Sequence, residues 1–314
     1  MSQAQQIAST ILMIRPAHFG YNEETADNNA FQSDKGGLSK AEIAEQAKAE
    51  FDALVAKLRE YDIAVIVIED TDDPIKTDAV FPNNWISFHE DNIVITYPMF
   101  SPNRRQERRD DIIDQLSEDY HIKQLIRLEP YEAEQRYLEG TGSMILDRAH
   151  LVAYACKSVR THPELFDAFC EMMNFEGVLF TAVDEKGGEI YHTNVMMALG
   201  EELAIICLDA IPNEAEKAKV TNQLRKANKE ILPISYAQMN AFAGNMLEVK
   251  NKKGEKFLVM SSSAYHSLDM QQTEKILKHT AILHSPLDTI ETYGGGSARC
   301  MMAEVFLPKR LKAS

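Results

Sequence analysis

A cysteine near the C-terminal end stands where a nucleophile could act. Three consecutive glycines, Gly294 to Gly296, precede the pair Arg299 and Cys300. Glycine permits positive φ and close backbone approach, which suits a loop that folds over a ligand and presents one side chain. A thiolate there would be the attacking group of a covalent mechanism. A lone cysteine is more often an inert apolar side chain, so position alone leaves both interpretations open.

A histidine and an amide, His192 and Asn194, lie two residues apart. If this segment is a strand, the two side chains point to the same face. A histidine exchanges protons near neutral pH, and an amide both donates and accepts hydrogen bonds. The pair therefore suits a site that handles a nitrogen leaving group, although a structural histidine at the end of a strand fits equally well.

Two further segments place polar residues in turns. Glu139 precedes Gly140-Thr141-Gly142, where its carboxylate would orient a histidine or bind a substrate nitrogen. Glutamate beside glycines is very often only a turn residue. Asn84 follows Pro82 and Asn83 and precedes Trp85, the only tryptophan in the chain, in a segment that is typical of a turn.

Charge and apolar patterning exclude several classes of protein. The 314 residues include 33 Lys and Arg against 48 Asp and Glu, a net charge of −15 that repels nucleic acid. The longest apolar runs fall short of the roughly 20 residues of a membrane span. Four cysteines without metal-ligand spacing, and a start without a targeting pattern, predict a reduced protein in the cytoplasm. We expect no nucleic acid and no membrane among its partners, and the sequence leaves a homo-oligomer open.

Strands and helices alternate along the whole chain, which predicts an α/β or α+β fold. Ser39 and Glu42 form a capping box before a helix whose buried face would carry Ile43, Ala47, Phe51, Leu54 and Leu58. A buried strand is expected directly after it, at 63–68. No linker divides the chain, so we expect one domain over residues 1–314. Further strands are expected at 92–96, 122–128, 143–146, 151–155, 177–181, 203–208, 231–234, 246–249 and 257–261, and helices at 103–116, 163–172, 214–227 and 270–278.

Together these segments resemble the guanidine-modifying enzymes of the pentein superfamily. The resemblance spans about residues 81 to 302 and is most specific at 98–107, which is similar to the Pro-Met-aromatic-x-Pro-x-Arg-Arg-Gln-Glu stretch of arginine deiminases. It implies a five-bladed α/β propeller of ββαβ units and a site that needs neither cofactor nor metal. It also implies a small ureido or guanidino amino acid as substrate.

The resemblance assigns a role to each matched residue. Cys300 becomes the nucleophile, His192 the general acid and base, and Glu139 the carboxylate that orients the chemistry. Arg104, the first arginine of the matched stretch, would bind the substrate α-carboxylate, for which its planar fork is suited.

Two departures from the arginine deiminase pattern bear on the substrate. Asn84 and Asn194 stand where those enzymes carry aspartates that clamp a guanidinium. A buried cation facing neutral amides loses its counter-charges, whereas an amide matches both the C=O and the NH₂ of a ureido group. The pattern is similar to that of citrulline ureidases and predicts hydrolysis of citrulline to ornithine, ammonia and carbon dioxide. The alternatives are an arginine deiminase, an N-acylarginine dihydrolase and a non-catalytic pentein scaffold.

Overall fold

The strands of the molecule form small sheets arranged around a centre. The computed structural model describes residues 5–34 and 37–310, and its strands there form five three-stranded sheets. Within each sheet the first strand pairs antiparallel with the second, and the second pairs parallel with the third. Because parallel neighbours need a crossover, a helix joins the second strand to the third in each unit. The expected propeller of ββαβ units is confirmed.

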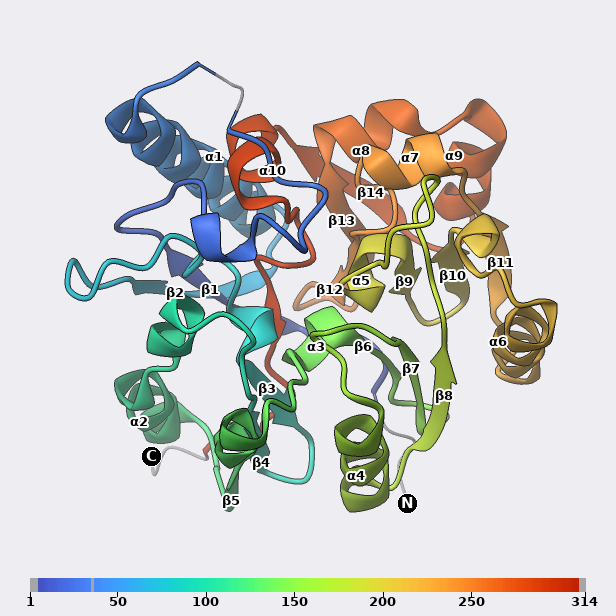
Figure 1. Ribbon diagram of the computed structural model, residues 1–314, viewed down its shortest axis with the longest axis horizontal. Helices are drawn as coiled ribbons and strands as arrows, with labels where there is room; N and C mark the ends of the chain where they lie inside the picture. Colours follow the sequence, from blue (N-terminus) through green and yellow to red (C-terminus); the bar gives the residue numbers. More distant parts are fainter. Residues whose placement is uncertain (1–4, 35–36, 311–314) are drawn as a thin grey trace.

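Four units are continuous in the chain, and the fifth is assembled from both ends. The continuous units follow the order β3-β4-α2-β5, β6-β7-α4-β8, β9-β10-α6-β11 and β12-β13-α8-α9-β14. The fifth joins β15 to β1, α1 and β2, so pairing between segments far apart in the sequence closes the ring. The long helices lie around the outside, whereas the short helices α3 and α5 lie near the centre (Figure 1). The bounds of the strands are β1 Thr10–Arg15, β2 Ala64–Glu69, β3 Ile86–His89, β4 Ile93–Thr96, β5 Gln124–Arg127, β6 Met144–Asp147, β7 Val152–Cys156, β8 Glu176–Phe180, β9 Met197–Leu199, β10 Leu203–Ile206, β11 Glu230–Pro233, β12 Leu247–Lys250, β13 Lys256–Ser261, β14 Ala281–Ser285 and β15 Ala303–Glu304.

The helix α1 follows the sequence prediction closely. It runs over Lys40–Glu60 behind a complete capping box of Ser39 and Glu42. The five apolar residues expected on its inner face are all buried. They belong to a hydrophobic cluster that also contains residues of β1, β12, β13 and β14. The other helices are α2 Asp110–Asp119, α3 Gly140–Ser143, α4 Pro163–Met173, α5 Thr193–Met196, α6 Glu214–Lys226, α7 Tyr236–Asn240, α8 Ser262–Ser267, α9 Met270–Leu277 and α10 Asp288–Gly294.

Two expected elements differ from the structure. Strand β2 is only half-buried along most of its length, because it is the outer strand of its sheet and pairs with β1 alone. The helix expected at 103–116 is instead a 3₁₀ turn over Asn103–Glu107 followed by α2. Extended backbone at Arg108 and Arg109 separates the two.

A short turn precedes the first strand of every unit and repeats the same geometry. In each turn the backbone N–H of the fourth residue donates to the carbonyl of the first, over 2.9 to 3.4 Å. We call these segments the inner turns. Their residues are 81–84, 139–142, 192–195, 242–245 and 297–300. The first strands of neighbouring units lie side by side, with β15 beside β3 and β9 beside both β6 and β12, so these turns meet near the centre.

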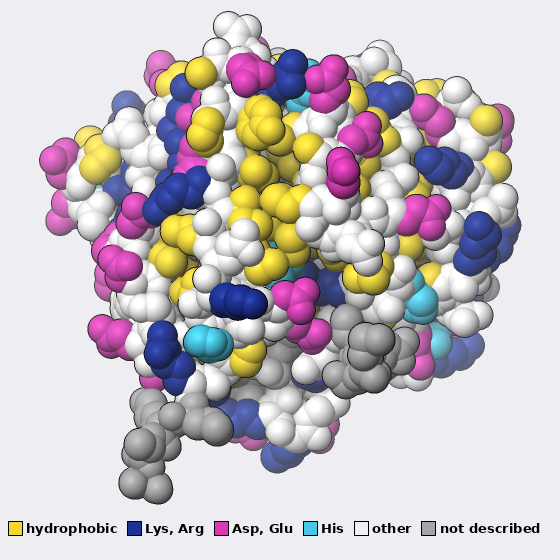
Figure 2. All heavy atoms as spheres, turned by 90° about the horizontal axis from the view of Figure 1, so that it is seen from below, with side chains coloured by type: hydrophobic (Ala, Val, Ile, Leu, Met, Phe, Trp, Pro, Cys, Tyr) yellow, Lys and Arg dark blue, Asp and Glu magenta, His cyan; other side chains and the backbone are white. Residues whose placement is uncertain are grey.

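The outer surface mixes charges of both signs. Figure 2 shows one face on which Lys and Arg side chains alternate with Asp and Glu around a band of hydrophobic side chains. Among the described residues, no helix is both long enough and apolar enough to cross a membrane.

Candidate active site

The inner turns bring the predicted catalytic and binding residues to one small cavity. Cys300, His192, Asn84 and Arg104 line it. Glu139 lies behind His192, and Asn194 touches the sulfur of Cys300. Apart from Arg104, these residues all belong to inner turns, so the convergence follows directly from the propeller.

The sulfur of Cys300 receives two amide hydrogen bonds. Nδ2 of Asn194 lies 3.3 Å from Sγ, and Nδ2 of Asn245 lies 3.2 Å from it. Cys300 itself is 4% exposed, at the fourth position of its inner turn. Both donors are thus directed at the atom that would attack carbon in a covalent mechanism.

His192 is held by a carboxylate. Its Nε2 lies 2.8 Å from Oε2 of Glu139. Burial, together with the charges of Arg160 and Arg104, lowers the pKa of His192 to about 4, against the opposing effect of Glu139. His192 is therefore neutral near pH 7. It precedes the short helix α5 and does not lie in a strand, so the expectation of a shared strand face with Asn194 is wrong.

Glu139 is a fully buried carboxylate that stays ionised. Burial by itself would raise its pKa, but Arg160, the hydrogen bond with His192 and the charge of Arg104 together hold it well below the usual range. Its other oxygen accepts from the backbone N–H of Phe100 at 2.9 Å. The carboxylate is therefore fixed in place and serves as a counter-charge for His192 when the ring takes a proton.

Arg104 is engaged by neighbouring side chains. Its Nε and Nη2 donate to the two carboxylate oxygens of Glu107 at 2.8 and 2.9 Å, and its Nη1 donates to Oδ1 of Asn84 at 3.0 Å. The bidentate edge that we expected to receive a substrate carboxylate thus faces Glu107. Arg104 borders the cavity and orients the amide of Asn84, while carboxylate binding by Arg104 stays a prediction.

The two predicted clamp amides carry unused polar atoms. Among the residues that the structure describes, neither Nδ2 of Asn84 nor Oδ1 of Asn194 has a hydrogen-bond partner, although both are buried. An unpaired buried polar atom costs folding free energy, and at a cavity it indicates a group that can bind a ligand. Asn84 offers a donor, and Asn194 offers an acceptor.

Three further polar residues at the site were missed by the sequence analysis. Arg160 and Asp78 line the cavity, and Asn245 contacts the sulfur of Cys300. Arg160 stacks over the ring of Tyr191 at 4.8 Å and donates to Oδ1 of Asn28. Asp78 is 4% exposed, and burial raises its pKa despite the nearby Arg104. No local motif marks Arg160 or Asp78, but Asn245 occupies the same inner-turn position as Asn84 and Cys300.

Two loops cover the cavity. Nδ2 of Asn29 donates to the carbonyl of Gly294 at 3.1 Å, and the hydroxyl of Tyr191 donates to the carbonyl of Gly295 at 2.7 Å. Gly295 has a φ of +62°, and a Cβ there would lie 2.6 Å from the amide of Asn29. The enclosed volume of about 10 Å³ holds roughly one water molecule.

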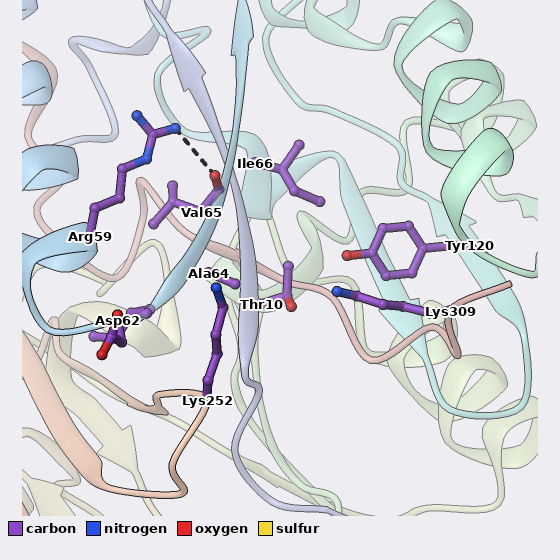
Figure 3. A pocket seen from close by; sticks show the side chains of 10 residues that line it. Thr10, Arg59, Asp62, Ala64, Val65, Ile66, Tyr120, Lys252 and Lys309 are labelled. Atoms are coloured by element: carbon purple, nitrogen blue, oxygen red, sulfur yellow. Dashed lines mark hydrogen bonds between the residues drawn. The ribbon is translucent and has the colours of Figure 1, made fainter. Parts of the chain in front are cut away.

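A wider pocket lies elsewhere on the molecule. Its volume is about 420 Å³, and it is bordered by Arg59, Asp62, Tyr120, Lys252 and Lys309 (Figure 3). None of the predicted site residues lines it. Size therefore does not identify the active site in this molecule, whereas the set of converging polar groups does.

The other three cysteines have different surroundings, and the sulfur of Cys156 accepts a hydrogen bond from the hydroxyl of Thr193 at 3.4 Å. Burial raises the pKa of Cys156 and Cys170 to about 12 each and also raises the pKa of Cys207. All three are buried and free of disulfides. They are inert compared with a thiol that receives two amide donors.

Comparison with known proteins agrees with the fold. A family model described as N,N dimethylarginine dimethylhydrolase, eukaryotic, matches residues 15–307. No curated protein sequence matches the chain. Among solved structures, the chain is similar to the N-terminal domain of ArgZ bound to substrate, an arginine dihydrolase from the ornithine-ammonia cycle in Cyanobacteria, with a TM-score of 0.74 at 16% identity. That match covers 95% of this chain and 98% of the domain.

Two further structures share the fold. AgrE in complex with ornithine and NAD+ has a TM-score of 0.73 at 18% identity, covering 97% of this chain. Dimethylarginine dimethylaminohydrolase as an adduct with S-methyl-L-thiocitrulline has a TM-score of 0.63 at 14% identity, covering 95% of this chain and 99% of that one. The chain spans about 40% of the length of the full ArgZ and AgrE chains. Since the family model covers nearly the whole sequence, the chain belongs to the N,N dimethylarginine dimethylhydrolase family, within the guanidine-modifying pentein superfamily.

Proposed function

We propose that this enzyme hydrolyses citrulline to ornithine, ammonia and carbon dioxide through a covalent adduct on Cys300. One observation carries the proposal: the unpaired buried Nδ2 of Asn84 and the unpaired buried Oδ1 of Asn194. A ureido group has a carbonyl that accepts a hydrogen bond and an NH₂ that donates one. The free donor of Asn84 therefore matches the ureido carbonyl, and the free acceptor of Asn194 matches the ureido NH₂. Neither contact needs a counter-charge.

Three charged residues suit the amino acid end of the substrate. Asp78 has a buried Oδ1 without a partner among the described residues, and a carboxylate suits an α-ammonium group. Arg160 and Arg104 both border the cavity and supply positive charge for an α-carboxylate. An ammonium beside Asp78 would also compensate a carboxylate whose burial otherwise penalises its charge.

The reaction proceeds in two stages that use the same histidine. Sγ of Cys300 attacks the ureido carbon, His192 takes the thiol proton, and the C–N bond to the terminal nitrogen breaks as His192 returns the proton to the leaving ammonia. A thiocarbamate now joins Cys300 to the substrate. Neutral His192 then takes a proton from water, whose oxygen attacks this carbon and frees the thiol. The carbamate that remains loses carbon dioxide and leaves ornithine.

Glu139 supports both stages. His192 carries a positive charge whenever it holds the transferred proton, and a fixed carboxylate at 2.8 Å stabilises that charge in a buried site. The same contact sets the orientation of the ring. Nε2 is occupied by Glu139, so Nδ1 is the nitrogen left to exchange protons with sulfur, water and ammonia.

Hydrolysis of arginine is the second candidate, and a specific observation favours it. The site contains a buried carboxylate besides Glu139, namely Asp78, and carboxylates bind guanidinium groups. ArgZ, which shares the fold, is an arginine dihydrolase. An arginine deiminase or an N-acylarginine dihydrolase remains within this candidate. A scaffold without activity is disfavoured by membership in a hydrolase family.

The experiment is a substrate panel with product analysis. The purified chain is incubated separately with citrulline, arginine, agmatine and N-succinylarginine, and ammonia and the amine product are quantified. We expect citrulline to give equal amounts of ammonia and ornithine, and Cys300→Ser to give neither. Faster release from arginine would replace the proposal with the second candidate, and no release from any compound would favour the scaffold.

A further inference from the structure

One inner turn contains none of the residues predicted from the sequence. It consists of Phe242, Ala243, Gly244 and Asn245, ahead of strand β12. A Cβ at Gly244 would lie 2.2 Å from the carbonyl oxygen of Val195, so this turn packs directly on the turn that contains His192 and Asn194. Asn245 stands at the fourth position, which in two other inner turns is occupied by Asn84 and Cys300.

The side chain of Asn245 is 1% exposed and both of its ends are engaged. Oδ1 accepts from the backbone N–H of Arg299 at 3.0 Å and from that of Cys300 at 3.4 Å. Nδ2 donates to the carbonyl of Asn194 at 2.9 Å and to Sγ of Cys300 at 3.2 Å. One side chain thus holds the backbone and the sulfur of the same cysteine.

The surroundings fix which end of the amide faces the sulfur. Two backbone N–H groups need an acceptor on one side, and a carbonyl oxygen needs a donor on the other. The reversed amide would oppose donor to donor and acceptor to acceptor at three contacts. The NH₂ group must therefore point at Sγ of Cys300.

We propose that Asn245 is a catalytic residue that, together with Asn194, stabilises the thiolate of Cys300 through amide N–H groups aimed at the sulfur. The proposal rests on the proposed role of Cys300 as nucleophile. Hydrogen bonds to a charged acceptor are roughly twice as strong as those between neutral groups. The buried site otherwise penalises a negative sulfur, so these two donors take the place of solvent. After hydrolysis frees the sulfur, the same donors receive the departing thiolate.

Substitutions can separate a structural role of Asn245 from a catalytic one. The acceptor Oδ1 clamps the backbone, and the donor Nδ2 serves the sulfur, so the two functions reside on different atoms. Asn245→Asp keeps the acceptor but removes the donor and sets a negative charge beside the sulfur. Asn245→Ala removes both.

The test measures the reactivity of Cys300 without any substrate. The rate constant for alkylation by iodoacetamide is recorded from pH 6 to pH 10, with mass spectrometry to confirm the modified residue. At pH 7 we expect Asn245→Ala to react about tenfold more slowly than the unmodified protein, and Asn245→Asp to react more slowly still. Both rates should recover toward the unmodified value at pH 10, because the thiolate forms there without help.

Controls separate this effect from loss of folding. Asn251 is an equally buried asparagine in the turn that follows β12, where it donates to the carbonyl of Tyr61. Asn251→Ala should leave the alkylation rate unchanged, and thermal unfolding reports whether each variant is folded. Folded Asn245→Ala and Asn245→Asp proteins that react as fast as the unmodified protein at pH 7 would overturn the proposal. The alkylation assay uses no substrate, so its result does not depend on whether the protein hydrolyses citrulline.

Discussion

Nε2 of His192 lies 2.8 Å from Oε2 of Glu139, and the two residues occupy the same first position of successive inner turns. The proposed acid and base pair therefore follows from the repeat, because one turn supplies the ring and its neighbour supplies the carboxylate. The fourth position of the other three inner turns supplies Asn84, Asn245 and Cys300. Most residues of the site therefore occupy the first or the fourth position of an inner turn.

Glu139→Gln should reduce turnover while the protein stays folded. The ionised carboxylate raises the proton affinity of His192, so its loss lowers the pKa of the ring further and weakens proton delivery to the leaving ammonia. We expect kcat to fall by about 100-fold or more, the usual size of a general acid–base contribution. Steady-state kinetics at several pH values measure this, and an unchanged kcat would contradict the role of the pair.

His192 should make stability depend on pH in a defined direction. Burial lowers its pKa from 6.5 to about 4 in the folded protein. The unfolded chain therefore binds the proton more tightly, so the contribution is present above pH 6.5 and is lost as the pH falls toward 4. Lowering the pH from 7.5 to 5 should therefore reduce the free energy of unfolding by about 2 kcal/mol through this residue.

The measurement is urea unfolding at both pH values, with His192→Gln as comparison. The variant should lose a smaller part of its stability over this interval, because no ring titrates there. Equal losses in the two proteins would mean that the ring is not held neutral by the fold.

Gly142→Ala should disturb the site without touching Cys300. A Cβ at Gly142 would lie 2.4 Å from Nδ2 of Asn84 and 2.9 Å from the ring of His192. Overpacking of this kind costs about 1 to 3 kcal/mol, and here the atoms that must shift are the functional ones. We expect kcat/KM to fall well beyond the change in stability. Gly20→Ala, with open space around its Cβ, is the control and should behave like the unmodified protein in both assays.

Restoring carboxylates at the clamp should shift the substrate preference. In Asn84→Asp with Asn194→Asp, both side chains become acceptors only, so one of them faces the ureido oxygen without a donor. Citrulline binding should weaken, and arginine binding should strengthen. Isothermal titration with the added Cys300→Ser substitution measures both affinities without turnover. A doubly substituted protein that still prefers citrulline would show that the two amides do not select the head group.

Local patterns predicted much of this molecule from the sequence. The capping box and the apolar spacing of α1 fixed that helix because they act within a few residues. Pairing of β15 with β1 joins the two ends of the chain, and no local pattern encodes it. The inner turns share a backbone hydrogen bond and a position in space, while their sequences differ at nearly every residue, so the repeat was not legible in the chain.

The residues of the site also divide into those that the local sequence indicates and those that only the fold brings together. Glu139, His192 and Cys300 stand beside glycines or in short polar segments, and those neighbours drew attention to them. Asn245 follows a phenylalanine, an alanine and a glycine, which is typical of an ordinary turn. Arg160 contacts Tyr191 and Asn28, and Asn28 lies far from it in the sequence. Such residues are found only once the fold has placed them.

The ratio of kcat/KM for citrulline to kcat/KM for arginine, measured on the unmodified protein under identical conditions, tests the central claim most directly. Buried amides at Asn84 and Asn194 that present a free donor and a free acceptor should select the neutral ureido group. We expect a ratio of at least about 100, since a buried cation without its counter-charges loses several kcal/mol. A ratio at or below one would contradict it and assign this site to arginine.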